Sequence, residues 1–288
     1  MFENKMQNQP ITMTKCPTMR DAIYGLAIGD AMGVPWEFTP RGSFCVTDMT
    51  GYGTYGQPAG TWSDDTALTL ATCYSIKHRG CIDLADILNC FRNWLYKAQF
   101  TATGEVFDVG STTRIAIGRG EGESDEQSNG NGSLMRIIPL AFVKDIKEQE
   151  IAAVSALTHA HRLSTDACIL YVNIARQLIQ KVPLQLIYRN IALPSSDFEW
   201  IRSIDTWLES EIKSSGYVLD TLQASLWVLA NSDSFYEAIL KAVNLGDDTD
   251  TVGAVTGALA GIIYGYQSIP EIWMSQLQNR DLIEECLF

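Results

Sequence analysis

The stretch NLGDDTDTVGAVTGALAGIIYG, residues 244–265, carries three aspartates at its start and is apolar and glycine-rich beyond them. Its glycines at positions 253, 257, 261 and 265 recur every four residues and therefore share one face of a helix. A glycine inside a helix costs about 1 kcal/mol relative to alanine. The spacing therefore predicts a central, buried helix whose glycine face packs closely against the backbone of another element.

The three aspartates, Asp247, Asp248 and Asp250, have an ordinary interpretation as caps, because carboxylates satisfy free N–H groups at the start of a helix. A second stretch, GTWSDDTALTLATC at 60–73, opens an apolar helical pattern with a similar set of oxygens. Mg²⁺ and Mn²⁺ prefer carboxylate, hydroxyl and water oxygens. Consecutive side chains on one helix diverge by about 100°, so one helix start cannot surround an ion, whereas two facing starts can.

Composition limits the class of protein. The chain has 288 residues and a formal net charge of −13, which argues against general binding to nucleic acids or anionic membranes. Its seven cysteines include no C-x-x-C pair, and its start, MFENKMQNQPITMTKC, lacks the apolar core of a secretion signal. We expect a reduced, cytoplasmic protein. Only three histidines are present, so an imidazole-rich metal site is not expected.

The periodicity of apolar residues predicts an all-α, compact single-domain helical bundle over residues 18–288, after an N-terminal extension at 1–17. Residues 39–56 form a Gly/aromatic loop that holds a short strand at most. The polar stretch 118–132 could link two domains, but it runs directly into a helix-like pattern, which favours a loop within one domain. Helices are expected at about 21–33, 64–79, 84–98, 111–118, 133–143, 148–160, 165–181, 198–214, 219–230, 234–244, 250–265 and 271–279.

Six stretches follow one another over about residues 20–266: GLAIGDAMGVPWEF (25–38), GTWSDDT (60–66), FDVGSTTR (107–114), GNGSLMR (130–136), LTHAH (157–161) and NLGDDTDTVGAVTGALAG (244–261). In this order they resemble the ADP-ribosylglycohydrolase family. That family includes dinitrogenase reductase-activating glycohydrolase and the ADP-ribosylarginine and ADP-ribosylserine hydrolases. The resemblance implies a dinuclear Mg²⁺ or Mn²⁺ centre that cleaves ADP-ribose from modified side chains.

The resemblance also assigns residues to the metals and the reaction. Asp247 stands where many members of the family have glycine. Proton transfer is assigned to Glu37, in the loop after the first helix, or to a metal-bridging aspartate, Asp65 or Asp248. The implied metal ligands are Ser63, Asp64, Asp65, Asp248, Asp250 and Thr251.

Glycine-rich helix starts could also hold the diphosphate of ADP-ribose, because backbone N–H groups there bind anions, although each is equally an ordinary turn. Arg136 is either a phosphate partner or part of a structural ion pair. By resemblance, His159 lies near the distal ribose or phosphates and Tyr217 lies beside the substrate. The residues of the two helix starts are Gly110, Ser111 and Thr112, and Gly130, Asn131, Gly132 and Ser133.

The function that this pattern predicts is metal-dependent hydrolysis of N-linked ADP-ribosylarginine on a protein, with ADP-ribose as product. One alternative is O-linked ADP-ribosylserine or a small ADP-ribosyl metabolite, because linkage choice depends on loops 39–58 and 118–130. Another is a non-catalytic binder, either a relic or an immunity protein that blocks an ADP-ribosylating toxin. A relic should have lost metal ligands, yet all six oxygen positions are present.

Overall fold

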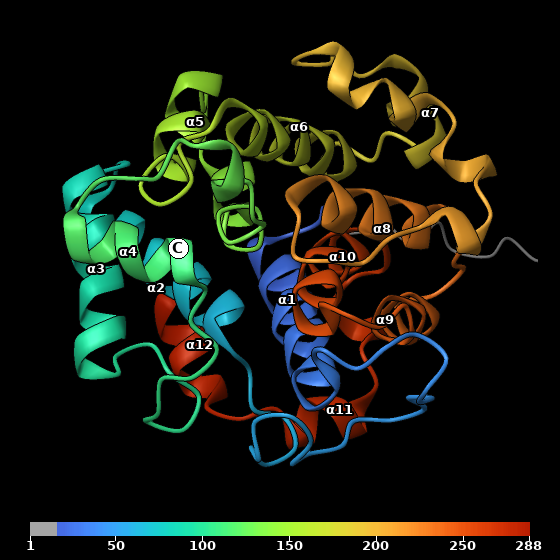
Figure 1. The fold of residues 1–288 in the computed structure, drawn as a ribbon, viewed down its shortest axis with the longest axis horizontal. Coiled ribbons are helices and arrows are strands. Elements are labelled where there is room, and N and C mark those ends of the chain that lie inside the picture. The colour runs from blue at the N-terminus through green and yellow to red at the C-terminus, as the bar shows by residue number, and fades with distance from the viewer. Residues whose placement is uncertain (1–15) are drawn as a thin grey trace, which may run out of the picture.

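Two antiparallel helices form the centre of the molecule, and the computed structural model describes residues 16–288 around them (Figure 1). Helix α1 (Met19–Gly33) packs on α10 (Thr249–Tyr264), and both are buried along almost their whole length. A Cβ atom built on Gly25 would lie 2.1 Å from the carbonyl oxygen of Gly257, and one on Gly29 would lie 2.0 Å from that of Gly253. The two backbones therefore touch where only glycine fits.

The predicted close approach to the glycine face of 250–265 is confirmed for three of its four glycines. Gly253, Gly257 and Gly261 each face a carbonyl oxygen of α1, at 2.4, 2.1 and 2.0 Å from the Cβ that they lack. Gly265 instead ends the helix with a φ of 83°, a conformation that favours glycine.

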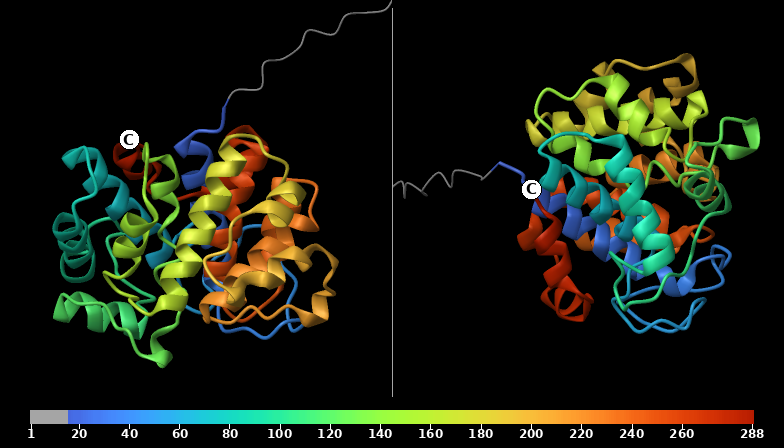
Figure 2. Two further views of the ribbon diagram at one scale, coloured as in Figure 1. Left: turned by 90° about the horizontal axis from the view of Figure 1, so that it is seen from above. Right: turned by 90° about the vertical axis from the view of Figure 1, so that its left-hand side faces the viewer.

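The other helices surround this pair. In Figure 1, α2, α3, α4 and α12 lie on one side of α1, α8 and α9 lie on the other, and α5 and α6 cross above. Both views of Figure 2 show the C-terminus close to the start of α1, where Arg20 and Tyr24 bond to Glu284 of α12. The bounds are α2 (Asp64–Arg79), α3 (Leu84–Lys97), α4 (Ser111–Arg119), α5 (Glu148–Ser155), α6 (Arg162–Ile179), α7 (Leu184–Asn190), α8 (Val218–Ala230), α9 (Phe235–Asn244), α11 (Glu271–Gln276) and α12 (Arg280–Cys286).

The all-α prediction is confirmed, since residues 16–288 contain helices and isolated bridges but no strand. Of the predicted extension 1–17, residues 1–15 lie outside the described part. The 118–132 stretch is tied into the same body, where Glu123 pairs with His159 and Gly130 pairs with Tyr217. No helix in the described range is long and apolar enough to cross a bilayer.

Two predicted α-helices were wrong. Residues 131–137 are turns, followed by a 3-10 helix at Ile138–Phe142, because Pro139 lacks an N–H and disfavours α geometry in the residue before it. The stretch predicted as 198–214 is three short 3-10 helices, Ser196–Arg202, Ile204–Thr206 and Glu209–Glu211. Within it the hydroxyls of Ser203 and Thr206 bond to backbone carbonyls, which competes with a regular α ladder.

The glycine contact generates a stability prediction. Gly257→Ala should destabilise the protein by about 3 kcal/mol or more, because its methyl group would meet the backbone of α1 rather than a movable side chain. Gly118→Ala is the matched control, since it also lies within a helix and its Cβ would meet only the Tyr96 hydroxyl at 3.6 Å. The control should be neutral or more stable by up to about 1 kcal/mol. Urea unfolding followed by circular dichroism measures both, and equal stability of the two variants would contradict the packing argument.

Candidate functional site

The starts of α2 and α10 meet at one corner because both are held by α1. The end of α1 touches the start of α10, where Thr249 Oγ1 donates to the carbonyl oxygen of Gly33 at 2.8 Å. Asp30, a buried carboxylate on α1, accepts bonds from Ser63 N at 2.9 Å, Thr66 N at 3.0 Å and Thr66 Oγ1 at 2.6 Å. Asp30 thus supplies a cap to α2 from a neighbouring helix, and this sets the position of the SDDT segment.

Carboxylates from five segments converge at this corner. Carboxyl oxygens of Asp30, Asp65 and Asp250 lie within 4.8 Å of one another, and so do those of Glu37, Asp108 and Asp250. Asp250 belongs to both groups, so these five acids form one continuous cluster. We count Asp248 with it, because Asp248 lies two residues from Asp250 and lines the same cavity as Glu37. The two aspartate-rich helix starts that the sequence indicated do face each other.

Four buried carboxylate oxygens in the cluster have no hydrogen-bond partner within the described chain: Glu37 Oε2, Asp65 Oδ1, Asp248 Oδ1 and Asp250 Oδ2. Both oxygens of Asp30, by contrast, accept hydrogen bonds from Ser63 or Thr66. A buried anionic oxygen without a donor is costly unless it binds a cation or a proton. The cluster therefore fits hard cations. Asp30 holds the start of α2 in place, and the oxygens without a hydrogen-bond donor are available as metal ligands.

Burial and mutual repulsion raise the pKa of these acids. Burial first, and then the charge of Asp108, raises the pKa of Glu37 to about 9. Burial is also the main reason that the pKa values of Asp64, Asp65 and Asp250 lie well above the usual range, and that of Asp30 rises to about 7. Without cations, the cluster would hold protons near neutral pH.

The hydroxyls that the sequence assigned to the metals lie at the same corner. Ser63 Oγ donates to Asp65 Oδ2 at 3.1 Å, and Thr251 Oγ1 lies 3.5 Å from the same oxygen. Asp64 and Thr251 both line the adjoining cavity. All six predicted ligands are thus brought together, while their role as ligands stays a prediction.

Asp247 does not belong to the cluster, although the sequence places it beside Asp248. Its side chain is exposed, and its φ of 60° explains why glycine suits this position. Its backbone accepts a bond from Phe38 N at 2.7 Å and donates to Thr39 O at 3.0 Å. Asp247 therefore links the loop that carries Glu37 to the start of α10.

A cavity of about 330 Å³ opens beside the acids. Of the predicted site residues it brings together Glu37, Asp64, Gly110, Ser111, Thr112, Gly130, Asn131, Gly132, His159, Asp248 and Thr251. Ser133, Arg136 and Tyr217 do not line it. Ser133 is fully buried and bonds to Ser155, and Arg136 is fully buried with no carboxylate partner in residues 16–288, so it forms no ion pair.

The glycine-rich segments differ in what they offer an anion. Gly110, Ser111 and Thr112 lie at the start of α4 and line the cavity, while their role in binding a diphosphate stays a prediction. Asn131 starts turns instead of a helix, and its backbone N–H donates to Gly216 O at 3.0 Å. Its side chain donates to Asp248 Oδ2 at 2.9 Å. Asn131 thus orients an acid of the cluster rather than presenting its N–H to a phosphate.

Sequence reasoning missed Asp30 and Asp108. Asp30 was visible as a lone carboxylate in the apolar pattern of residues 22–33, which is unusual for a buried face. Asp108 lies in FDVGSTTR, faces the cavity and accepts a bond from the Tyr55 hydroxyl at 2.8 Å. Its φ of 50° turns the chain there, a feature that the sequence does not reveal.

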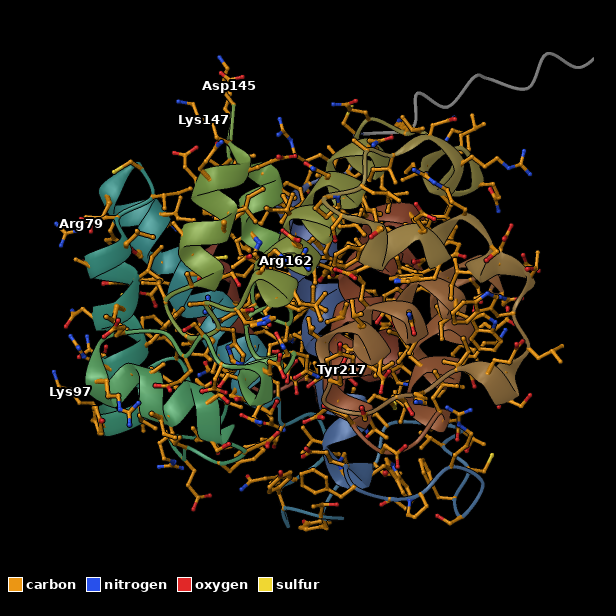
Figure 3. The ribbon with its side chains drawn as sticks, turned by 45° about the horizontal axis from the view of Figure 1, so that its top comes forward. Arg79, Lys97, Asp145, Lys147, Arg162 and Tyr217 are labelled. Atoms are coloured by element: carbon orange, nitrogen blue, oxygen red, sulfur yellow. The ribbon has the colours of Figure 1, made fainter. Side chains whose placement is uncertain are left out.

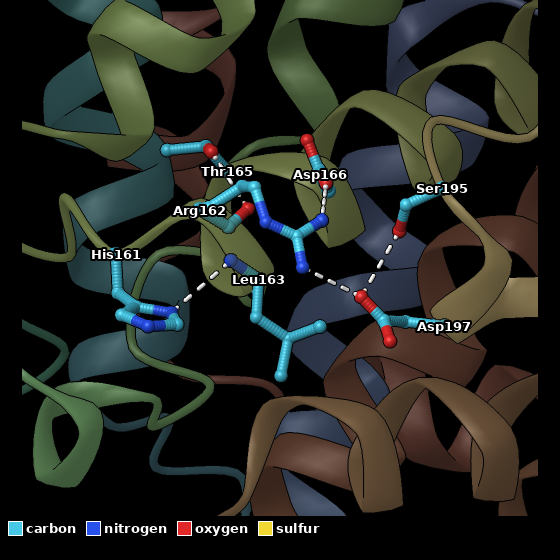
Figure 4. A network of polar contacts seen from close by, with 7 residues as sticks. All are labelled: His161, Arg162, Leu163, Thr165, Asp166, Ser195 and Asp197. Carbon is cyan, nitrogen blue, oxygen red and sulfur yellow. Dashed lines mark hydrogen bonds and ion pairs between the residues drawn. The ribbon is translucent and has the colours of Figure 1, made fainter.

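Arg162 and Tyr217 lie at the starts of α6 and α8, outside the lining of the cavity (Figure 3). Arg162 bonds to Asp166 on its own helix at 2.9 Å and to Asp197 at 2.7 Å, and Ser195 donates to the same oxygen of Asp197 (Figure 4). These bonds tie the 3-10 segment at 196–202 to α6. Tyr217 is 40% exposed, which leaves its ring free at the surface.

Known proteins are similar to this chain in sequence and in fold. The model of the family described as ADP-ribosylglycohydrolase matches residues 15–287. ADP-ribosylarginine hydrolase Tri1 of Serratia proteamaculans (strain 568) is 33% identical over 278 residues, covering 92% of this chain and 76% of the relative. ADP-ribosyl-(dinitrogen reductase) glycohydrolase of Rhodospirillum rubrum is 32% identical over 283 residues, covering 90% of each protein.

A solved structure supports the same relationship. A chain described as an ADP-ribosylglycohydrolase-related protein complex superposes with a TM-score of 0.77 and 31% identity, covering 93% of this chain and 95% of that chain. With the family model matched over nearly the whole length and the fold shared, the chain belongs to the ADP-ribosylglycohydrolase family.

Proposed function

We propose that this protein is a metal-dependent hydrolase that removes ADP-ribose from ADP-ribosylated arginine side chains of proteins. The observation that carries the proposal is the set of four buried carboxylate oxygens without a partner at the edge of a cavity. Membership of a hydrolase family supports the reaction type. Relatives at 33% identity are named ADP-ribosylarginine hydrolase, which supports the linkage.

Two divalent cations, Mg²⁺ or Mn²⁺, would be held by oxygens from the two facing helix starts. When bound, such ions lower the pKa of a coordinated water and orient substrate hydroxyls. The residues that would hold them are Ser63, Asp64, Asp65, Asp248, Asp250 and Thr251.

Glu37 would transfer the proton. Its Oε2 is buried without a partner, and Glu37 lines the same cavity as Asp64 and Asp248. Burial and the charge of Asp108 raise the pKa of Glu37 to about 9 before any cation is bound. Cations on the neighbouring aspartates would lower this pKa toward neutral pH, where the carboxyl can take a proton from the attacking water and give one to the leaving guanidine.

The walls of the cavity would hold the rest of the substrate. Backbone N–H groups at the start of α4 and the imidazole of His159 supply donors for a diphosphate. Asp108 is an acid of the lining that is assigned neither to a cation nor to proton transfer, and it favours a cationic guanidinium over a neutral serine linkage. Serine-linked or small-metabolite turnover, and toxin binding without turnover, are alternative outcomes of the tests below.

Turnover of an ADP-ribosylarginine protein is the test of the function. With Mg²⁺ or Mn²⁺ we expect release of free ADP-ribose, and with chelator we expect none. An ADP-ribosylserine protein serves as the parallel substrate, and chromatography of the released ADP-ribose measures both. Turnover of the serine substrate alone would contradict the linkage, and no turnover of either with metal present would contradict the hydrolase.

Metal binding should be visible without any substrate. Mg²⁺ or Mn²⁺ at millimolar concentration should raise Tm, because cations neutralise aspartates that otherwise repel one another. Asp64→Asn and Asp248→Asn should each remove most of this rise and abolish turnover while the fold stays helical. Asp247→Asn is the matched control, since its exposed side chain lies outside the cluster. Calorimetric titration without any binding would refute the metal centre.

Glu37→Gln separates proton transfer from binding. The variant should fold and bind metal and ADP-ribose, but its kcat should fall by about 10²–10⁴, the usual effect of losing a proton-transfer group. Glu105→Gln is the control, because Glu105 is an exposed acid whose carboxylate bonds to Gln57. A kcat for Glu37→Gln within about threefold of wild type would move proton transfer to Asp65 or Asp248.

A further inference from the structure

His159 is a buried imidazole at the wall of the cavity, only 2% exposed. Its ring packs against Gly132, where a Cβ would lie 2.7 Å from His159 Cε1 and 3.3 Å from Nε2. Its Nε2 edge also lies near Gly130, 3.5 Å from the Cβ position of that glycine. Both glycines line the cavity, so they leave room for the Nε2 edge of the ring to face it.

The other ring nitrogen points into the protein. His159 Nδ1 lies 2.9 Å from Thr158 Oγ1, and the Thr158 side chain is fully buried. Ser155 Oγ donates to the carbonyl oxygen of His159 at 3.2 Å and lies 2.9 Å from Ser133 Oγ. The position of the histidine is therefore determined by contacts on the side away from the cavity.

Behind Thr158 lies a buried guanidinium. Arg136 Nη2 donates to Thr158 Oγ1 at 2.8 Å, and both Nη1 and Nη2 lie 3.3 Å from Val154 O. Its Cζ lies 4.5 Å from the centre of the Phe91 ring, a cation–π contact. No ion pair in residues 16–288 includes Arg136, so its charge is compensated only by neutral groups.

The direction of each hydrogen bond in this chain follows from what each group can donate. A guanidinium has donors and no acceptor, so Thr158 Oγ1 must accept from Arg136. The hydroxyl of Thr158 has one proton to give, and His159 Nδ1 is the acceptor that the structure places within reach. If Thr158 donates to Nδ1, then a neutral imidazole carries its proton on Nε2.

The charge state agrees with this direction. Burial, and then the positive charge of Arg136, lowers the pKa of His159 to about 3. The ring is therefore neutral near pH 7, and one of its nitrogens must be an acceptor.

We propose that Arg136 and Thr158 are positioning residues that hold His159 as its Nε2–H tautomer, so that the cavity wall presents a neutral N–H donor to a diphosphate oxygen of bound ADP-ribose. The identity of the ligand rests on the proposed function, whereas the tautomer does not. Arg136 thus acts on the cavity through two other side chains, without contacting the ligand.

Nitrogen NMR of protein labelled with ¹⁵N-histidine tests the tautomer directly, in the absence of substrate. The chain has three histidines, so the spectrum is simple, and the signals lost in His159→Asn identify the residue. We expect Nδ1 of His159 to resonate as an unprotonated, pyridine-type nitrogen and Nε2 as a protonated one. A protonated Nδ1 with a free Nε2 in the wild-type protein would overturn the proposal.

Two substitutions at Thr158 test the cause. Thr158→Val keeps the shape but removes the hydroxyl, so His159 should shift toward Nδ1–H, and affinity for ADP-ribose should fall about tenfold or more by calorimetry. Thr158→Ser keeps the hydroxyl and should retain both the tautomer and the affinity. Unchanged Nε2–H signal and affinity in Thr158→Val would refute the role of the hydroxyl, and so would a loss in Thr158→Ser equal to that in Thr158→Val.

Arg136→Met removes the donor, which would free the Thr158 hydroxyl to accept from the ring, so a mixture of tautomers is expected. A pure Nε2–H signal in that variant would overturn the part assigned to the arginine. If Arg136→Met does not fold, the wild-type spectrum and the comparison of Thr158→Val with Thr158→Ser still test the tautomer and its cause. Wild-type protein with the expected tautomer but no affinity for ADP-ribose would contradict the proposed ligand and leave the positioning chain intact.

Discussion

The backbone contact between α1 and α10 is the constraint on which the rest of the molecule depends. Glycines on each helix replace side chains where the two backbones touch, so the helices cannot slide without a clash. A Cβ on Gly33 would lie 2.3 Å from the Cα of Asp250, so the end of one helix abuts the start of the other. The oxygens at the start of α10 therefore have a fixed position along α1 relative to Asp30. Asp30 in turn accepts hydrogen bonds from the start of α2 and holds it in place.

The acids of the site differ in whether their carboxylate oxygens accept hydrogen bonds. Asp30 accepts hydrogen bonds from the start of α2 and supports that helix. Glu37, Asp65, Asp248 and Asp250 each keep a buried oxygen to which no group in residues 16–288 donates. The pKa values of Glu37, Asp65 and Asp250 are raised for the same reason, because burial without a compensating donor or cation favours the protonated acid. At the cavity wall, His159 adds a neutral polar group, and the buried Arg136 lies behind it, bonded to Thr158.

Features that depend on residues close together in the sequence could be predicted, whereas features that depend on backbone geometry could not. The helix starts at Ser63 and Asp248 were predictable, because cap residues and apolar periodicity lie within a few positions of each other. The helices expected at 133–143 and 198–214 were wrong, since turns and 3-10 helices satisfy an apolar pattern equally well when a proline or backbone-bonding hydroxyls intervene. Asp108 was missed because its direction depends on a backbone angle.

The sequence by itself determined the all-α class, the central glycine-faced helix, the two acidic helix starts and, through six ordered motifs, the family. These are properties of spacing, and spacing is fully present in the chain. Only the tertiary structure decided that Asp247 points away while Asp250 joins both groups of acids, and that Asp30 caps a different helix. It also decided that Arg136 reaches Thr158 instead of the cavity. Such outcomes depend on which donor meets which acceptor between distant segments, and that geometry exists only once the helices have packed.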